Sequence, residues 1–326
     1  MKRLLFISVL FASLFTSCKK QWTGEHITLN LADVHPQGFP TVIGCQDFAN
    51  SVYERSHGRI IINVQTEAFS ETTLVESVRA GKLDFARVSG GLLADVDADF
   101  RVLNIPFLFR DAGHFWKVLN SEIGQHILDG LWSYGFAGLC YYESGARSFY
   151  ANTPVYTLDD LRHLKIRIQN NSLMLNFITA LGATPYPIEY NDVFSAFTNN
   201  AIQAAENNIP SYWSARHYQV ARYYFADQHT RIPDLIIASK KMLATLSAED
   251  IALIKKAAAD SVHAQRLAWE EYELNATRSL TKEGIYIITP HFLKDSAATR
   301  QISEALAKSL PYPQQRSEEH TSELQS

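Results

Sequence analysis

Residues 71–91, ETTLVESVRAGKLDFARVSGG, contain a helix pattern followed by a strand pattern. Apolar residues recur at three- and four-residue spacing up to Gly81, which occupies the position where helices commonly stop. The run from Leu83 to Val88 then predicts a strand. Strand, helix and strand patterns precede this unit at residues 27–31, 41–56 and 59–69. The order β-α-β-α-β predicts an α/β fold with a mostly parallel sheet.

A second α/β series begins near Leu158. Within it, residues 164–171 read LKIRIQNN and alternate apolar with polar side chains, as in a strand with one face in water. Further helices are predicted near residues 173–181 and 192–199, and further strands at 184–187 and 201–205. A long helix is predicted from Ser247 to about Thr281, opening on the capping-box pattern SAED. Because this series is embedded between portions of the first, we predict that the chain crosses between two lobes more than once.

Both ends of the chain are predicted to lie outside the folded domain. Residues 1–17 combine two basic residues with an apolar run, which predicts a secretory signal peptide. The residues before Cys18 resemble a bacterial lipobox, so we expect a lipidated Cys18 and a tether over residues 18–26; a plain exported protein cut nearby is the alternative. Residues 316–326, RSEEHTSELQS, resemble the translation of a sequencing-adapter oligonucleotide, and we expect them to be an artefact.

The composition excludes some partners. In a chain of 326 residues, 46% are hydrophobic, which supports a large core in two lobes. Lys and Arg number 30 against 34 Asp and Glu, a formal net charge of −4. A nucleic acid partner is therefore not expected, because binding it needs a basic excess. For Cys45 and Cys140 we expect buried free thiols rather than a disulfide.

The signatures of common enzymes are absent from the sequence. It contains no G-x-S-x-G, H-E-x-x-H, Walker or G-x-G-x-x-G motif. The histidines are scattered, without the helical pairs that bind metal, and His35 is interpreted as a surface or loop residue. We therefore expect no catalytic residues, no metal and no cofactor.

Three polar residues follow or end predicted strands: Arg147, Arg167 and Asn207. In open parallel sheets ligands collect at the carboxyl ends of strands, so the three are expected to converge on one cleft. Arginine suits a carboxylate because its planar guanidinium forms two parallel charge-assisted hydrogen bonds.

Several stretches in this order resemble one family, the solute-binding proteins of the TRAP (tripartite ATP-independent periplasmic) transporters, or DctP family. Together they extend from about residue 27 to about residue 287. They are FANSVYERSHGRIIINV, VESVRAGKLDFARVSGG, NIPFLFRDAGHFWKVLN, YESGARSFYANTPVYTLDDLRHLKIRIQNN, ALGATPYPIEYNDVFSAFTNNAIQAAENN and LSAEDIALIKKAA.

The resemblance implies an α/β, two-lobed periplasmic-binding-protein fold, type II-like, with the lobes joined by crossing strands and a long spanning helix. The expected lobe 1 comprises residues 27–144 and about 233–272, and lobe 2 comprises 145–232 and about 273–315. The implied protein is periplasmic and held at the membrane by its lipid anchor only. It captures a carboxylate-bearing organic acid by cleft closure and delivers it to a small and a large integral membrane subunit.

The resemblance also implies site residues. The family's K-[IV]-R strand matches residues 165–167, so Arg167 is expected to bind the ligand carboxylate through two hydrogen bonds. Arg147 matches a common second contact to the same anion. Asn207 matches the ligand amide, although the family's Asp-Gly pair is absent here and Asn208 stands where proline is usual. The resemblance therefore does not predict the orientation of Asn207.

Two further residues are expected at the pocket wall. Tyr190 matches an aromatic residue of the pocket, with a core tyrosine as the alternative. Ser89 follows a strand of the opposite lobe and is expected to face the ligand. For neighbouring Arg87 we weigh contact with a second acid group of the ligand against a surface charge.

Two other classes of protein remain open at this point. One is a binding protein of another transport or sensory system, and the other is an exported enzyme on a similar two-lobed fold. The acid itself is not identified, because C4-dicarboxylates, sugar acids, keto acids and amino acids all offer a carboxylate.

Overall fold

The computed structural model describes residues 24–67, 70–289 and 297–310. The predicted signal peptide over residues 1–17, the lipidated Cys18 and the artefact over residues 316–326 lie outside these ranges.

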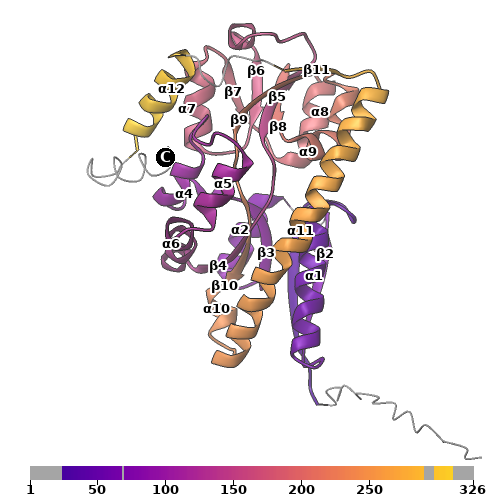
Figure 1. Cartoon of the computed structure of the whole chain (residues 1–326), viewed down its shortest axis with the longest axis vertical. Coiled ribbons are helices and arrows are strands. Elements are labelled where there is room, and N and C mark those ends of the chain that lie inside the picture. The colour runs from indigo at the N-terminus through magenta and orange to yellow at the C-terminus, as the bar shows by residue number, and fades with distance from the viewer. Residues whose placement is uncertain (1–23, 68–69, 290–296, 311–326) are drawn as a thin grey trace, which may run out of the picture.

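One mixed sheet has the strand order β2-β1-β3-β10-β4 (Figure 1). Its strands are β1 (Ile27–Asp33), β2 (Ile60–Thr66), β3 (Phe85–Ser89), β4 (Phe136–Tyr142) and β10 (Asp234–Ser239). β1 pairs in parallel with both β2 and β3, as the β-α-β-α-β order predicted. β10 is antiparallel to β3 and β4, so the prediction of a mostly parallel sheet holds only for the first three strands.

The second sheet has the order β11-β9-β5-β8-β6-β7. Its strands are β5 (Arg147–Ala151), β6 (Lys165–Ile168), β7 (Thr184–Pro187), β8 (Ala204–Asn207), β9 (Tyr223–Thr230) and β11 (Tyr286–Ile288). β6 is parallel to β7 and β8, whereas β5 is antiparallel to β8 and β9. We call the part built on the first sheet lobe 1 and the part built on the second sheet lobe 2.

Helices cover both faces of each sheet (Figure 1). Those packed in lobe 1 are α1 (Pro40–Arg55), α2 (Glu71–Ala80), α3 (Gly90–Leu93), α4 (Ala98–Leu103), α5 (Ala112–Leu119), α6 (Glu122–Gly130), η1 (Leu131–Tyr134) and α10 (Lys240–Leu243). Those packed in lobe 2 are η2 (Leu158–Leu161), α7 (Ser172–Ala180), η3 (Tyr190–Asp192), α8 (Val193–Thr198), α9 (Ile209–Ser214), η4 (His217–Gln219) and α12 (Ala297–Lys308).

The central strand β10 is apolar on both sides because its sheet separates two hydrophobic clusters. In β10, Leu235 and Ile237 belong to one cluster of lobe 1, and Ile236 and Ala238 belong to the other. Buried strands of this kind lack polar alternation, since successive side chains point to opposite faces and both faces are covered. Cys45 and Cys140 lie buried in lobe 1 as free thiols, as predicted.

Helix α11 (Ala248–Lys282) spans both lobes (Figure 1). It packs along α1 and β4 in lobe 1 and reaches α9 in lobe 2, where Leu280 is fully buried. The chain also crosses directly from β4 to β5 and from β9 to β10. The predicted two-lobed α/β fold with crossing strands and a spanning helix is confirmed.

Among the helices that the structure describes, none combines the length and the hydropathy that a membrane crossing requires.

Candidate functional site

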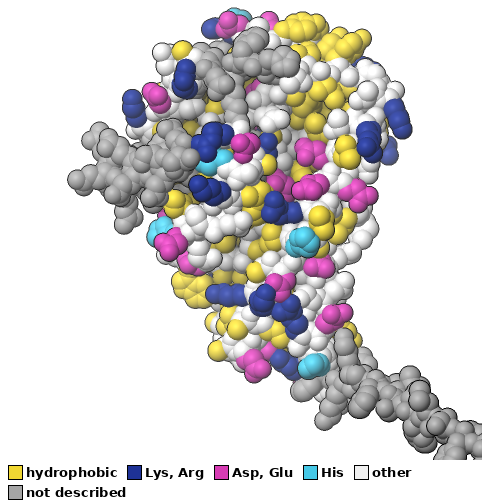
Figure 2. All heavy atoms as spheres, viewed as in Figure 1, with side chains coloured by type: hydrophobic (Ala, Val, Ile, Leu, Met, Phe, Trp, Pro, Cys, Tyr) yellow, Lys and Arg dark blue, Asp and Glu magenta, His cyan; other side chains and the backbone are white. Residues whose placement is uncertain are grey.

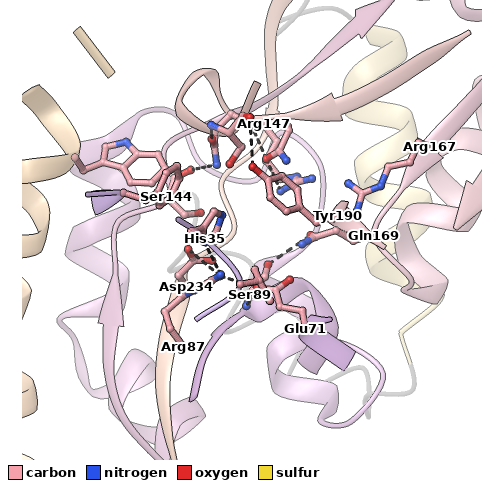
Figure 3. A pocket seen from close by; sticks show the side chains of 16 residues that line it. His35, Glu71, Arg87, Ser89, Ser144, Arg147, Arg167, Gln169, Tyr190 and Asp234 are labelled. Atoms are coloured by element: carbon pink, nitrogen blue, oxygen red, sulfur yellow. Dashed lines mark hydrogen bonds and ion pairs between the residues drawn. The ribbon is translucent and has the colours of Figure 1, made fainter. Parts of the chain in front are cut away.

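A cavity with about 400 Å³ of empty volume lies between the lobes (Figure 3). The structure brings all five residues predicted for the site to its wall: Ser89, Arg147, Arg167, Tyr190 and Asn207. In Figure 3, Arg147, Arg167 and Tyr190 of lobe 2 lie above the cavity, and Ser89 of lobe 1 lies below it. The ligand contacts expected of these residues remain predictions.

The strand pairing explains how distant residues meet. β5 is antiparallel to β8, and Ser148 pairs with Asn207, so the first residue of β5 lies at the carboxyl end of β8. Arg167 on β6 pairs with Ala205 on the other side of β8. The convergence therefore arises in a mixed sheet, where Arg147 begins its strand, and not from the parallel strand ends that the sequence suggested.

Arg167 is buried without an acidic partner. Its side chain is 3% exposed, and its Nε donates to the carbonyl oxygen of Ile188 at 2.8 Å. Among the described residues, no carboxylate lies within ion-pair distance of it, and neither terminal nitrogen has a hydrogen-bond partner. Burial lowers the pKa of the Arg167 guanidinium. A buried charge needs a counterion, so these two nitrogens form a site for an anion.

The flanks of Arg167 show how β6 holds it. Ile166 and Ile168 are fully buried in a hydrophobic cluster of lobe 2, while Lys165 is exposed. On the polar side of this strand Lys165 thus lies in solvent and Arg167 lines the cavity between the lobes, as expected for a strand with one apolar and one polar side.

Arg147 already has a carboxylate partner. Its Nε and Nη2 donate to the two carboxylate oxygens of Glu206 at 2.5 and 2.8 Å. Nη2 also donates to the backbone oxygen of Glu206, and Nη1 donates to Oδ1 of Asn207 at 3.1 Å. Burial opposes the charge of Glu206, but the adjacent Arg147 lowers the pKa of this carboxyl to about 2. Only one N–H of Nη1 is left for a ligand, so the charge of Arg147 is largely neutralised within the protein.

The segment after β8 is fixed by two asparagines. Oδ1 of Asn207 also accepts a hydrogen bond from the backbone N–H of Asn208 at 2.9 Å, and this leaves the amide nitrogen of Asn207 as its free donor. Asn208 caps α9 by accepting from the backbone of Ser211, and its side chain donates to the oxygen of Ser144. The asparagine that replaces the usual proline thus holds Asn207 in place by capping.

Tyr190 and Ser89 form opposite walls. The Tyr190 hydroxyl lies 3.4 Å from the oxygen of Ser211 and 3.3 Å from Oγ of Ser214, and its ring lies 5.3 Å from the ring of His35. Ser89 caps the short helix α3 and donates to Oε1 of Gln169 at 3.4 Å. This last contact joins the two lobes across the cavity.

The lobe 1 wall is an ion network around Arg87, which is 1% exposed. Its terminal nitrogens bond Asp33 at 2.7 Å and Glu71 at 2.6 Å, and Asp234 lies 3.4 Å away. The interpretation of Arg87 as a surface charge is wrong. His35 is in a loop as expected but buried, with Nδ1 2.8 Å from Oδ1 of Asp33.

The polar residues of the site region that sequence reasoning missed include Glu71, Gln169, Glu206 and Asp234. The signal available for Glu206 and Asp234 was a charged residue inside or at the start of an apolar strand, in AAEN and in DLIIAS. A buried strand tolerates such a charge only when a partner is present.

A buried arginine without a counterion, held in a cavity between two lobes that the chain crosses repeatedly, defines a class: two-lobed binding proteins for a small anion. Residues 31–310 match the family model of the bacterial extracellular solute-binding proteins, family 7 (DctP), and the chain belongs to this family.

The relatives include solute-binding proteins, and the similar solved structures are TRAP periplasmic solute-binding proteins. A solute-binding protein of Chromohalobacter salexigens is 33% identical over 258 residues, 78% of this chain and 77% of that protein. The crystal structure of a TRAP periplasmic solute-binding protein of Xanthobacter autotrophicus with bound β-D-galacturonate is 33% identical, with a TM-score of 0.86 over 91% of this chain and 98% of that one. A counterpart from Pseudomonas putida with bound D-glucuronate is 30% identical, with a TM-score of 0.82 over 90% and 97%.

The protein is therefore an extracytoplasmic solute-binding protein of the TRAP type. Its family consists of binding proteins, so the prediction that the chain is not an enzyme is confirmed.

Proposed function

We propose that this protein captures a hexuronate, a sugar acid with one carboxylate, and presents it to a TRAP transporter. The observation that carries the proposal is Arg167, a buried guanidinium with no carboxylate near it among the described residues. The proposal takes its ligand class from the galacturonate- and glucuronate-bound relatives, and its anchoring chemistry from the two free nitrogens of Arg167.

The proposed contacts follow from the free donors. Arg167 binds the carboxylate with both terminal nitrogens, and the remaining N–H of Arg147 and the amide of Asn207 reach the same group. Tyr190 supplies an apolar wall, and Ser89 contacts the ligand from lobe 1. Charge-assisted hydrogen bonds contribute roughly 1.5–3 kcal/mol each, so the carboxylate dominates the affinity.

Closure of the cleft couples ligand binding to transport. In the open protein Arg167 is hydrated, and closure of the lobes over the ligand removes that water and strengthens the ion pair. The closed form is the one that a small and a large integral membrane subunit recognise. Lobe 1 comprises residues 27–144 and about 233–272, and lobe 2 comprises 145–232 and about 273–315.

The proposed cellular context is the periplasm. Residues 1–17 direct export, and a lipid on Cys18 holds the domain near the membrane through the tether of residues 18–26. Mass spectrometry of the protein isolated from membranes tests this, because a diacylglyceryl Cys18 at the N-terminus is expected. An unlipidated N-terminus contradicts the anchor.

The ligand proposal is tested by native mass spectrometry of the purified protein, followed by calorimetric titration with D-galacturonate and D-glucuronate. We expect a co-purified sugar acid and binding of at least one of the two uronates. A protein that binds neither uronate, or that retains a ligand without a carboxylate, contradicts the proposal.

A further inference from the structure

The lobe 1 wall of the cavity carries two carboxyl groups with unused oxygens. Oε1 of Glu71 accepts hydrogen bonds from Arg87 and from the backbone N–H of Ser89, whereas its Oε2 has no partner among the described residues. Asp234 contacts Arg87 at an ion-pair distance of 3.4 Å and has no closer hydrogen-bond partner in the described part of the chain. Both residues line the cavity, together with Arg167.

Both carboxylate oxygens of Asp33, which lies behind these two residues, already have partners within the protein. Its Oδ1 contacts Arg87 and His35, and its Oδ2 accepts from the Thr41 hydroxyl at 2.5 Å. Asp33 is therefore a structural partner of Arg87 and offers nothing to a ligand. The acceptors that face the cavity are Glu71 and Asp234.

The cluster around Arg87 is negative. Arg87 is the one cation that pairs with the carboxyl groups of Asp33, Glu71 and Asp234 among the described residues. The net charge of these four side chains is −2 when all three carboxyl groups are ionised and −1 when Asp234 holds a proton. Burial raises the pKa of Asp234 to about 8, and burial, with Arg87 beside it, lowers the pKa of His35, which keeps that ring neutral. The cluster is thus negative in either protonation state of Asp234.

Arg87 has no capacity left for a ligand anion. Nη1 contacts Glu71 and Asp234, Nη2 contacts Asp33 and His35, and Nε is buried without a partner among the described residues. An arginine in this state holds its carboxylates in place rather than binding a second acid group. Figure 3 shows the resulting asymmetry, with Arg147 and Arg167 on one side of the cavity and Glu71 and Asp234 on the other.

We infer that Glu71 and Asp234 recognise the end of the ligand that lies away from Arg167. They accept hydrogen bonds from hydroxyl groups at that end and repel a second carboxylate. The inference rests on the proposed function and deepens it, because it names the residues that separate hydroxy monoacids from diacids. A hydroxyl donates to a free carboxylate oxygen, whereas a carboxylate placed there meets a negative cluster in a site of low dielectric.

The first arm of the test compares two ligands of the same sugar, D-galacturonate and its diacid galactarate, by calorimetry on the mature protein. The wild type is expected to bind galacturonate at least about tenfold more tightly, since like charges placed together across an interface cost that much or more. Glu71→Gln is expected to narrow this ratio of affinities, because it removes one negative charge. Asp234→Asn is expected to narrow it in titrations above about pH 8, where Asp234 is ionised and the substitution removes its charge.

The second arm measures hydroxyl recognition. Galacturonate is expected to bind Glu71→Ala at least about tenfold more weakly than wild type. Glu71→Gln, which keeps an acceptor oxygen, is expected to lose less. The matched control is Glu76→Gln, the same charge change on an exposed residue of α2 that pairs only with Arg79 among the described residues, and it is expected to leave both affinities unchanged.

The outcomes separate the two proposals. If the wild type binds no uronate, the proposed function fails. If it binds galacturonate but accepts galactarate equally well, or if neither charge-removing variant changes the ratio, the function stands and the inference is overturned. Tm values of all variants are measured alongside, and because Glu71 and Asp234 are changed separately, one unstable variant leaves the other to decide.

Discussion

Arg167 carries the ligand proposal at the scale of a single residue. We predict that Arg167→Ala weakens binding of the cognate acid by about 2–5 kcal/mol, the usual effect of removing one partner of a buried charge pair. Arg167→Lys is also expected to lose affinity, since an ammonium group cannot form two parallel hydrogen bonds. Calorimetric titration measures both.

The ligand-free protein provides the control for Arg167. Because this guanidinium has no acidic partner among the described residues, the Tm of ligand-free Arg167→Ala is expected to be no lower than that of wild type. Arg162→Ala removes an exposed arginine just before β6 and is expected to change neither quantity. Wild-type affinity in Arg167→Ala would mean that the carboxylate binds elsewhere.

Glu206 is predicted to matter more for stability than its place near the site suggests. Glu206→Ala leaves Arg147 buried without its carboxylate, which costs about 3–5 kcal/mol of unfolding free energy. Urea denaturation measures this loss. Glu270→Ala, on the exposed side of α11, is the control and is expected to stay within about 0.5 kcal/mol of wild type. Equal stability of the two variants would show that Arg147 finds another partner.

His229 lies next to the pair of Arg147 and Glu206, and its pKa is predicted to be higher than that of an ordinary histidine. Burial opposes its charge, but the Asp227 carboxylate 3.0 Å away raises the pKa of His229 to about 9, above its ordinary value of 6.5. The folded state therefore holds a proton that the unfolded state releases. The stability from this group is complete below pH 6.5 and is lost as the pH rises through about 9.

NMR titration of the His229 ring protons measures that pKa directly. We expect a midpoint near pH 9, and we expect His229→Asn to flatten the fall in unfolding free energy between pH 6.5 and 9. The comparison with this variant is needed because Asp234, whose pKa burial raises to about 8, also makes the protein less stable as the pH rises. A ring that titrates near 6.5 rules out the buried ion pair.

The site could be predicted from the residues alone only where one residue type carries its own chemistry. Arg147, Arg167 and Asn207, where predicted strands end or turn, suggested an anion site, and the family resemblance added Ser89 and Tyr190. All five line the cavity. Glu206 was not predicted as a site residue, because its role depends on Arg147, 59 residues away, and on the antiparallel pairing of β5 with β8. A partner set by non-local pairing leaves no pattern in a local window.

At the scale of elements, the contact between α1 and α11 leads to a further prediction. A Cβ added at Gly44 would lie 2.7 Å from Cβ of Gln265 and 2.9 Å from the Tyr142 ring. Gln265 cannot yield easily, because its side chain accepts from the N–H of Glu143 and donates to the Glu143 oxygen, both at 2.8 Å. These bonds tie α11 to the segment that crosses between the lobes.

Gly44→Ala is therefore expected to destabilise the protein by about 1–3 kcal/mol, the usual cost of overpacking. Helix propensity alone would favour alanine by about 0.5–1 kcal/mol. The sign of the measured change in stability therefore shows whether overpacking or helix propensity has the larger effect. Chemical denaturation gives the value. Gly113→Ala, on the exposed start of α5, is the control. Its added Cβ would lie 3.2 Å from Oδ1 of the exposed Asp111 side chain, which can shift by a few tenths of an ångström, so its effect is expected to stay within about 0.5 kcal/mol. A stabilised Gly44→Ala would show that the two helices can separate slightly at no cost.

Most of the predicted helices and strands are present in the structure, and two of the strands that were missed share a physical feature. α1, α2 and α11 lie within a few residues of their predicted ranges, and Ser247 accepts from the backbone N–H of Asp250 as the capping pattern indicated. The side chain of Asp250 also pairs with Arg59. Strands β5, β9 and β10 received no prediction. Two of them, β5 and β10, are buried throughout, so their sequences do not alternate between apolar and polar residues.

At the scale of the whole molecule, basic and acidic side chains are interspersed on the face seen in Figure 2, which fits the formal net charge of −4. The balance between open and closed lobes therefore depends on specific contacts rather than on a general attraction between oppositely charged surfaces. The two-lobed order was readable from the sequence because one α/β series is embedded in the other. The contacts between the lobes were not, since they join residues far apart in the chain.

Among the described residues, several side-chain hydrogen bonds join the two lobes. Ser172 at the start of α7 donates to Asp95 of lobe 1 through its backbone N–H at 2.9 Å and its hydroxyl at 2.5 Å. Thr72 donates to Glu189 at 2.6 Å, and Ser89 donates to Gln169 at 3.4 Å. These bonds exist only while the lobes are closed, so they favour the closed state together with any bound ligand.

Asp95→Ala is accordingly predicted to shift the ligand-free protein toward the open state without touching the ligand. Asp95 and Ser172 are exposed, so the lost bonds are worth about 1 kcal/mol and the affinity for the cognate acid falls about fivefold. Small-angle scattering is expected to give a larger radius of gyration for the ligand-free variant and the wild-type value at saturating ligand. Asp159→Ala, which removes a carboxylate paired with Arg162 inside lobe 2, controls for charge and is expected to change neither measurement. If Asp95→Ala matches the wild type in affinity and in scattering, the lobes close on the ligand alone, and the bonds between Asp95 and Ser172 form after closure without biasing it.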